Sequence, residues 1–553
     1  MPAIPMKRSM PALALALLLA GCQTPESQQA AQSQPPALFE DFGSLHRDIG
    51  SDVPAAQRYF DQGLRMAYGF NHEAAGRAFA EAARLDPDCA MCLWGQALVL
   101  GPNINLPMPA EAAAPAAKFA AQAQRLAGNA RPVDRALIEA LATRYADPAP
   151  ADRKPLDEAY AAAMGEVARR FPGDDDVATL HAEALMDLSP WAYWSPEGTP
   201  GKHTATLVAE LERVLARNPR HIGAIHYYIH AVESSPEPQR AEAYADTLGE
   251  LAPGSGHLVH MPAHTYIRVG RYHDATLVNF AASTADAAFL AVCGGSNGVY
   301  PLGYVPHNWH FASMSASLHG SRTLALQAAE QTARRADMQQ LEALSFMQQY
   351  LVTPLLVQVR FARWDDILAQ GAPPAELPYP RALWHYARGM AHLGRGDHAK
   401  ADAELDALRR LAADPALAKV EVGAVNRGDA VVKVALPMLA GELALATGKR
   451  DAGLAELRNA VAAEDALAYN EPADWLLPVR PYLGAALLEA GRADEATQVY
   501  AQDLQVYPKN GWSLYGLAQA QREQGQRALA DRTEAQYKDA WQWADAPLSR
   551  SRM

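Results

Sequence analysis

The residues of this 553-residue chain with the clearest capacity for chemistry are histidines that recur at a fixed spacing. His226 and His230 form one pair, and His260 and His264 form a second pair 34 residues further along the chain. The two members of a pair are four residues apart, so on a helix they share one face. Pairs in the same phase of a repeat lie on neighbouring repeats and face a common surface. Imidazoles gathered in this way can bind a transition metal ion.

Counting from the proline before each pair extends the pattern. Both pairs fall 7 and 11 residues after a proline, Pro219 in one case and Pro253 in the other. The second segment adds a histidine four residues after its proline, and a segment that begins near Pro306 adds two more, three residues apart. We therefore expect one zinc, copper or iron ion, or a dinuclear pair of ions, to be bound within a set of seven histidines: His226, His230, His257, His260, His264, His307 and His310.

Charged residues in the same phase complete the predicted groove. Glu233 follows His230 by one turn, and we interpret it as a catalytic general base or as a residue that orients a ligating imidazole. The same count from Pro172 places Glu183 and Asp187 in the groove. Arg268 is a candidate for holding a substrate anion, with an exposed salt bridge as the alternative. A metal here suits two reaction classes, hydrolysis by a metal-bound water and oxidation by copper or iron.

The same histidine pattern can also be explained without a bound metal. Duplication of one repeat would place two histidine pairs in register without any function, although it would not explain Glu233, His307 and His310. A groove of neutral imidazoles would also suit a peptide carboxylate, or hydrogen bonds to nearby tyrosines. Pro262 lies inside the second pair, and a proline inside a helix kinks the axis and frees a carbonyl.

The rest of the chain predicts the fold that must position these residues. Apolar residues, many of them alanine, follow helical spacing throughout, and strand-like alternation is absent. Three segments carry a recurring pattern of small, aromatic and proline residues: Gly63, Ala75, Phe79, Ala82 and Pro87; Trp384, Gly389, Gly396, Asp397 and Ala401; and Gly484, Gly491, Ala496, Tyr500 and Pro508. This pattern resembles the tetratricopeptide repeat (TPR) superfamily from about residue 56 to 540.

The resemblance implies an all-α fold, a right-handed α-α superhelix of the TPR-like solenoid kind. We expect an N-terminal array over 56–320 that contains the histidine-rich groove, and a C-terminal array over 321–545. Irregular insertions interrupt the repeats near 101–107, 188–203 and 291–306, and long loops in a compact array often serve as lids or binding loops. In the second insertion, Trp191, Tyr193 and Trp194 are candidates to cap the groove or to anchor the loop.

The N-terminus has the pattern of an export signal. Lys7 and Arg8 precede an apolar run that is too short to span a bilayer, and Leu19-Ala20-Gly21-Cys22 follows. This end resembles a bacterial lipoprotein signal over 1–21, with lipidation at Cys22 and a flexible tether within 22–55. It implies an outer-membrane lipoprotein that lies on the periplasmic side and has the membrane as a partner. We expect no later segment to be long and apolar enough to span a membrane.

Composition narrows the remaining function classes. The formal net charge is −13, and the absence of a basic run argues against nucleic-acid binding. Cys89 and Cys92 form a disulfide or remain buried thiols, and the state of Cys293 is left open. No nucleophile elbow, phosphate loop or dinucleotide fingerprint is present.

The sequence therefore favours a lipid-anchored periplasmic solenoid that binds a transition metal in its concave groove, with or without a metal-dependent hydrolase or oxidase activity. The alternative is a non-catalytic scaffold that binds a peptide or an envelope protein partner in the same groove.

Overall fold

The computed structural model describes residues 35–293, 298–423 and 425–552. Cys22 and the predicted signal lie outside the described residues. Almost all regular structure in the described part is helical, and consecutive helices pack as antiparallel hairpins. The predicted all-α superhelix with irregular insertions is confirmed.

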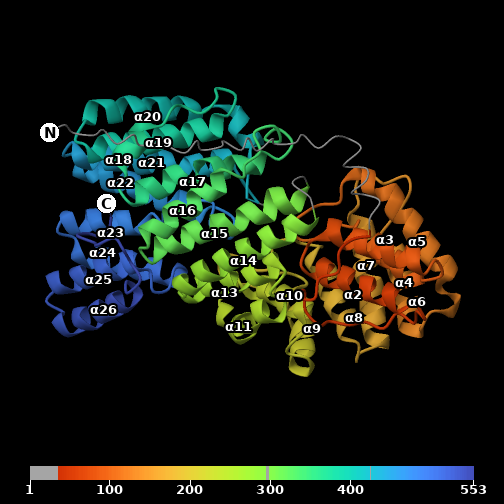
Figure 1. Cartoon of the computed structure of the whole chain (residues 1–553). Helices are drawn as coiled ribbons and strands as arrows, with labels where there is room; N and C mark the ends of the chain where they lie inside the picture. The colour runs from red at the N-terminus through yellow and green to blue at the C-terminus, as the bar shows by residue number, and fades with distance from the viewer. Residues whose placement is uncertain (1–34, 294–297, 424, 553) are drawn as a thin grey trace, which may run out of the picture.

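The first hairpins lie at one end of the molecule, in red and orange in Figure 1. Their helices are α2 (Pro54–Tyr68), α3 (His72–Leu85), α4 (Ala90–Leu98), α5 (Ala113–Leu126), α6 (Pro132–Ala142), α7 (Lys154–Arg170) and α8 (Asp175–Met186), with the short 3-10 helices η1 (Ala110–Ala112) and η2 (Ala127–Asn129).

The central helices lie in the middle of the molecule in Figure 1 and carry the histidines. They are α9 (Thr204–Arg217), α10 (Ile222–Val232), α11 (Glu242–Leu251), α12 (Gly256–His260), α13 (Pro262–Val269), α14 (Tyr272–Cys293), α15 (Val305–Leu318) and α16 (Arg322–Ala333). A 3-10 helix η3 (Pro238–Ala241) and a π-helical turn η4 (Tyr300–Tyr304) lie between them.

The last part of the chain contains α17 (Gln348–Arg360), α18 (Trp364–Ala369), α19 (Pro378–Gly394), α20 (His398–Ala412), α21 (Gly428–Ala446), α22 (Arg450–Asp465), α23 (Arg480–Glu489), α24 (Ala493–Val506), α25 (Gly511–Glu523) and α26 (Arg527–Ala540). The 3-10 helices η5 (Ser345–Met347) and η6 (Pro415–Lys419) and two short antiparallel strands, β1 (Glu421–Val422) and β2 (Asn426–Arg427), complete it, with Glu421 opposite Arg427.

Close packing between hairpins explains the small and aromatic residues of the repeat pattern. The Phe79 ring lies between Gly63 on α2 and Gly95 on α4, where an added Cβ would come within 2.7 and 2.5 Å of the ring. Tyr500 lies between Gly484 and Gly516 in the same way. Only glycine leaves room for an aromatic side chain to enter at these points, since interiors are close-packed. The TPR-like packing is therefore present at both ends of the chain.

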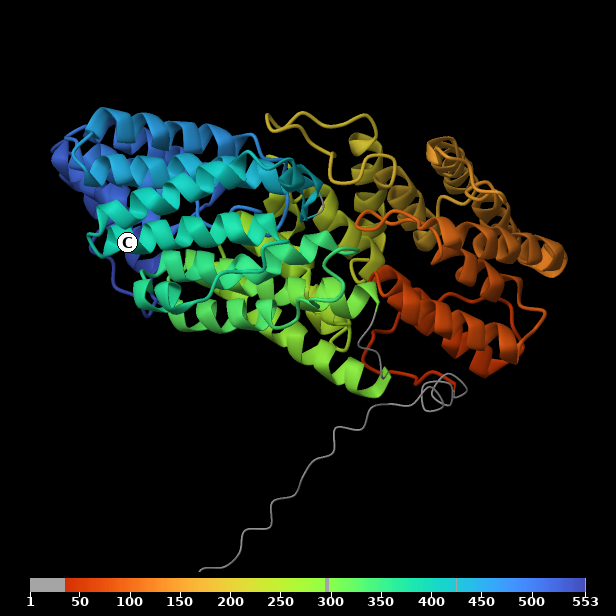
Figure 2. The ribbon, with the colours of Figure 1, turned by 90° about the horizontal axis from the view of Figure 1, so that it is seen from above.

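The last helices pack against the central ones, as Figures 1 and 2 indicate. Trp512 on α25 donates its Nε1 hydrogen to the backbone oxygen of Ser317 on α15, at 3.0 Å. Gln349 on α17 donates to Asp474, which precedes α23, at 3.0 Å. In an open solenoid each repeat contacts only its neighbours. Here distant repeats meet, and residues from the last third of the chain are brought towards the central helices.

The start of the described chain corrects one expectation. Residues 35–53 fall within the segment expected to be a flexible tether, yet Phe42 is buried and Arg47 is only 6% exposed. The guanidinium of Arg47 pairs with Asp134, Asp174 and Asp176 at 3.0 to 3.2 Å. Breaking a buried ion pair of this kind is strongly destabilising, so the segment that carries Arg47 is held in place. This part of the segment is therefore packed against the first hairpins.

Two further expectations are resolved. Cys89 and Cys92 form a disulfide at the start of α4, and Cys293 is a free thiol. Contrary to expectation, α14 is long and apolar enough to span a membrane by length and composition. Its buried face carries Asn279 and Asp286, which hydrogen-bond to residues of α12 and α15. These polar contacts place α14 in the helical array.

Candidate metal centre

Four helices position the candidate histidines. His226 and His230 lie on α10, His257 and His260 on α12, and His264 on α13, while α15 contributes His307 and His310. His307 is half-buried, and the other six are at most 2% exposed. Imidazoles are seldom all taken out of water unless they have partners. The clustering predicted from the 34-residue spacing is present.

Pro262 does not separate the second histidine pair. The helix breaks at Met261, so that α12 ends at His260 and α13 begins with Pro262. At the first position of a helix the missing N–H of proline costs nothing, because that donor has no intrahelical partner. The Nε2 atoms of His260 and His264 lie 2.9 Å apart across the break. The interruption is slight, because Met261 keeps right-handed helical backbone angles, and the two imidazoles stay in contact.

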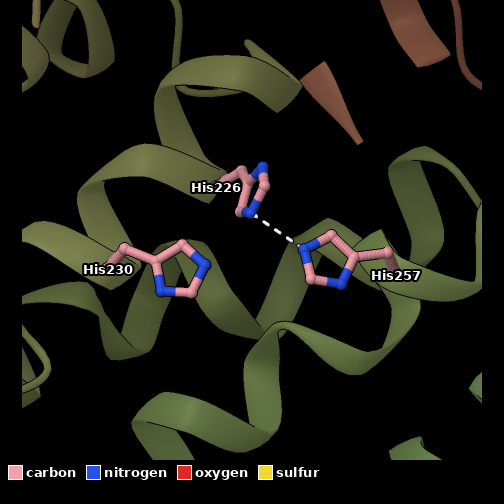
Figure 3. Close-up of side chains that lie close together, drawn as sticks. All are labelled: His226, His230 and His257. Carbon is pink, nitrogen blue, oxygen red and sulfur yellow. Dashed lines mark hydrogen bonds between the residues drawn. The ribbon is translucent and has the colours of Figure 1, made fainter. Parts of the chain in front are cut away.

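The histidines form two triads. In the first, shown in Figure 3, one nitrogen from each of His226, His230 and His257 lies within 4.8 Å of the others. The Nε2 atoms of His226 and His257 are 3.1 Å apart. The second triad contains His260, His264 and His307, and the Nε2 atoms of His260 and His307 are 3.2 Å apart. Each triad has the ligand number of a three-histidine metal site.

Hydrogen bonds behind the triads fix which ring nitrogen points inward. His226 donates its Nδ1 hydrogen to the backbone oxygen of Tyr68 at 2.6 Å. His260 donates its Nδ1 hydrogen to Oδ1 of Asn279 at 2.6 Å. The side-chain amide of Asn279 donates to the backbone oxygen of Ala275, and this bond sets the orientation of the Asn279 amide. With the proton on Nδ1, each Nε2 carries a free lone pair directed at the cluster.

Glu233 connects the two triads. Its Oε1 accepts from Nδ1 of His230 at 2.8 Å, and its Oε2 accepts from Nδ1 of His264 at 2.5 Å. Burial opposes ionisation of this carboxyl, but the charges and hydrogen bonds of His264 and His230 outweigh it and lower its pKa to about 2. Both oxygens are thus occupied, which favours the orienting role for Glu233 over that of general base.

Arg268 has a structural role beside this carboxylate. Its Nε donates to the backbone oxygen of Glu233 at 2.9 Å, and its guanidinium lies 5.6 Å from the centre of the Tyr469 ring. These contacts replace the exposed salt bridge that was the alternative for this residue. Arg268 therefore holds the end of α10 against the last third of the chain.

The imidazoles resist protonation. Burial, reinforced by neighbouring imidazoles, holds the pKa values of His226, His257, His260 and His307 well below the usual 6.5. Neutral imidazole is the form that ligates metals. These four imidazoles are therefore held in their ligating form.

A cavity of about 170 Å³ opens beside both triads. All three irregular insertions contribute to its walls, through Asn105 and Leu106, through Trp191, and through Val299, Gly303 and Tyr304. His310 also lines it but belongs to neither triad; its ring lies 5.8 Å from that of Tyr350, and burial lowers its pKa to about 3. Trp194 instead anchors its loop by donating to the backbone oxygen of Ala231 at 2.8 Å.

Residues from η5, α17 and later segments complete the lining of the cavity, and no sequence pattern predicted them. They are Phe346, Gln349, Tyr350, Gly423, Asn470, Glu471 and Pro472. Glu471 is 6% exposed, and its Oε2 has no hydrogen-bond partner among the described residues. Burial raises the pKa of Glu471 to about 7. It is the carboxylate that faces the cavity.

Glu183 and Asp187 do not join the histidines. They lie together at the end of α8, where Asp187 pairs with the buried guanidinium of Arg144. Burial raises the pKa of both carboxyls, and the charge of Glu183 adds to the effect on Asp187. Neither residue lines the cavity or belongs to a histidine group, so the groove position predicted for these two residues is corrected.

Comparison with known proteins adds little about function. No protein-family model and no curated protein matches the chain. Three solved structures are similar over most of its length. They are the APC/C hetero-tetramer Cut9–Hcn1 (13% identity, TM-score 0.30, 91% of this chain and 76% of that chain), a human IFIT1 dimer with m7Gppp-AAAA (11%, 0.32, 89% and 91%) and yeast Tom70 (12%, 0.27, 87% and 92%). Similarity at this level carries no functional argument, and the chain's own packing shows a TPR-like solenoid of helical hairpins.

Proposed function

We propose that the protein binds a transition metal, zinc, copper or iron, through the histidine triads in its interior. The observation that carries this is the contact between His260 and His264. Each donates its Nδ1 hydrogen to an oxygen, so two lone pairs on Nε2 atoms face each other at 2.9 Å. A bound cation removes their repulsion, and protonation of a buried imidazole is costly.

The donor set supports this choice of metals. All six triad ligands are imidazoles, which suit zinc, copper and iron, whereas calcium and magnesium take oxygen ligands. In addition, Nε2 of His230 is buried with no hydrogen-bond partner among the described residues. A buried acceptor left in this state costs free energy, and ligation to a metal would satisfy it.

If the centre is catalytic, the cavity indicates which residue exchanges protons. A bound metal would supply a Lewis acid for hydrolysis or a redox centre for oxidation. Glu233 has both oxygens hydrogen-bonded to imidazoles, whereas Glu471 faces the cavity with a free oxygen. We therefore assign Glu233 to orienting His230 and His264, and proton transfer with a bound ligand to Glu471.

Metal analysis of the purified protein tests the proposal. We expect stoichiometric zinc, copper or iron by inductively coupled plasma mass spectrometry after mild dialysis, and at least a tenfold loss in a His260→Ala/His264→Ala variant. His385→Ala is the matched control, because His385 pairs with Glu404 in a later repeat. Wild-type protein without stoichiometric metal would refute the proposal.

A protein-binding role is the second candidate, and one surface favours it. Helix α14 exposes Leu277 and Val292 at 51% and 60%, and solenoids commonly bind partners along extended surfaces. The cavity is too small for a folded partner or a long peptide. Unchanged metal content in the His260→Ala/His264→Ala variant, together with lost partner binding, would favour this second role.

We further propose that Cys22 carries the lipid that anchors the protein to the outer membrane on its periplasmic side. The support is the Leu-Ala-Gly-Cys motif after a short apolar run. We expect wild-type protein to incorporate labelled palmitate and to fractionate with outer membranes, and Cys22→Ser to lose both properties. Cys293→Ser is the matched control, and equal labelling of the two variants would contradict the assignment.

A further inference from the structure

We infer that the histidine cluster is a dinuclear centre, in which each triad holds one ion and the open position of both ions faces the same cavity. The inference rests on the proposed function, since it requires that the triads bind metal. It adds the number of ions, the ligands of each ion and the kind of molecule that could bind between them.

The shortest contacts between imidazole nitrogens divide the six imidazoles into two sites. In a tetrahedral zinc site with bonds near 2.0–2.1 Å, neighbouring ligand nitrogens lie about 3.3 Å apart. The measured contacts are 3.1 Å within the first triad and 2.9 and 3.2 Å within the second. One pair of nitrogens in the first triad and two pairs in the second thus lie close to ligand spacing, and the remaining nitrogens of each triad lie within 4.8 Å. A single ion with three protein ligands and an open position would leave the other triad unused.

The two triads are built alike. Each has one imidazole at the back that does not line the cavity, His226 in the first and His260 in the second. Each of these donates backwards to a buried oxygen, on Tyr68 or on Asn279. The other two members of each triad line the cavity. An ion in either triad therefore has its remaining position directed into the shared space.

Glu233 ties the sites together. It holds His230 of the first triad and His264 of the second, whose ring centres are 5.0 Å apart. Paired ions at about 3.5–4 Å commonly clamp one small ligand between them. An apolar cavity of roughly 150 Å³ accommodates benzene, so the space here suits a molecule of about one ring that has an oxygen or nitrogen donor.

Counting ions in matched variants tests the inference. The full chain, stripped of metal and reloaded with zinc, is freed of loosely held ions with a weak chelator and analysed for zinc per chain. We expect two ions in the wild type, one in His226→Ala, one in His260→Ala and none in the double variant. His385→Ala is the control, because His385 pairs with Glu404 in a later repeat, and it is expected to keep two.

Each result decides between the two proposals. One ion in the wild type overturns the dinuclear inference alone, and no ion overturns the proposed function. If a single variant still binds two ions, the substituted histidine is not a ligand. Loss of both ions from a single variant that circular dichroism shows to be folded would overturn the division into two triads. The wild-type count needs no variant and stands even where a variant fails to fold.

Discussion

Removal of the bound metal is expected to destabilise the protein by about 2.7 kcal/mol for each ion, when the free ion had been present at a hundred times its dissociation constant. A metal that binds the folded chain and not the unfolded chain adds its binding free energy to folding. The effect is expected to be large here because the ligands come from four helices, α10, α12, α13 and α15. Without an ion, the Nε2 lone pairs of His260 and His264 remain opposed at 2.9 Å.

Urea unfolding at several zinc concentrations measures this effect. The midpoint should rise with free zinc in the wild type and fall when a strong chelator is added. Hydrogen exchange should increase first in α12 and α13, the short helices on either side of the break at Met261. The His226→Ala/His260→Ala double variant is the control, and its midpoint should not respond. A wild-type midpoint that is equally insensitive to zinc would show that the metal contributes nothing to folding.

The sequence was sufficient to predict the fold and the core of the site because both follow from periodicity. A repeat places the same position of successive hairpins on the same side of the array. The offset of 34 residues therefore predicted a real contact, since the rings of His230 and His264 lie 5.0 Å apart on neighbouring helices. Gly63 and Phe79 likewise predicted the packing between hairpins, because only residues of particular sizes fit where two helices approach closely.

Periodicity failed where contacts depend on more than the phase of a helix. Glu183 and Asp187 have the expected phase, but Asp187 pairs with the buried Arg144, and neither carboxyl lines the cavity beside the histidines. Glu471 has no local signal at all. It reaches the cavity because distant repeats pack against each other, as the bond from Trp512 to Ser317 shows.

Most of the groups that orient the imidazoles also could not be predicted from the sequence. His226 donates to a backbone oxygen, that of Tyr68, and every residue has such an oxygen. Asn279 lies on α14, a helix whose sequence is mostly apolar and suggests only packing. Of these acceptors, only Glu233 could be predicted, because it lies on the same helical face as His230 and its side chain is charged.

Glu233 therefore offers the sharpest test of how the centre is held. Its carboxylate accepts hydrogen bonds from Nδ1 of both His230 and His264. Glutamine has nearly the same shape, but it offers one acceptor oxygen and a donor amide. In Glu233→Gln, one imidazole must face the amide hydrogens and accept them on Nδ1. Its proton then moves to Nε2, and that nitrogen can no longer bind metal.

The two substitutions at this position should therefore differ. Glu233→Gln is expected to weaken zinc binding about 10–100-fold at one triad and to spare the other, because one imidazole keeps its acceptor. Glu233→Ala removes the acceptor from both imidazoles and should weaken both triads. Zinc competition against a chromophoric chelator resolves the two affinities. Glu212→Gln is the matched control, since Glu212 contacts Tyr228 and Arg240 and no triad histidine. Wild-type affinity in both Glu233 variants would show that the histidines are oriented without this carboxylate.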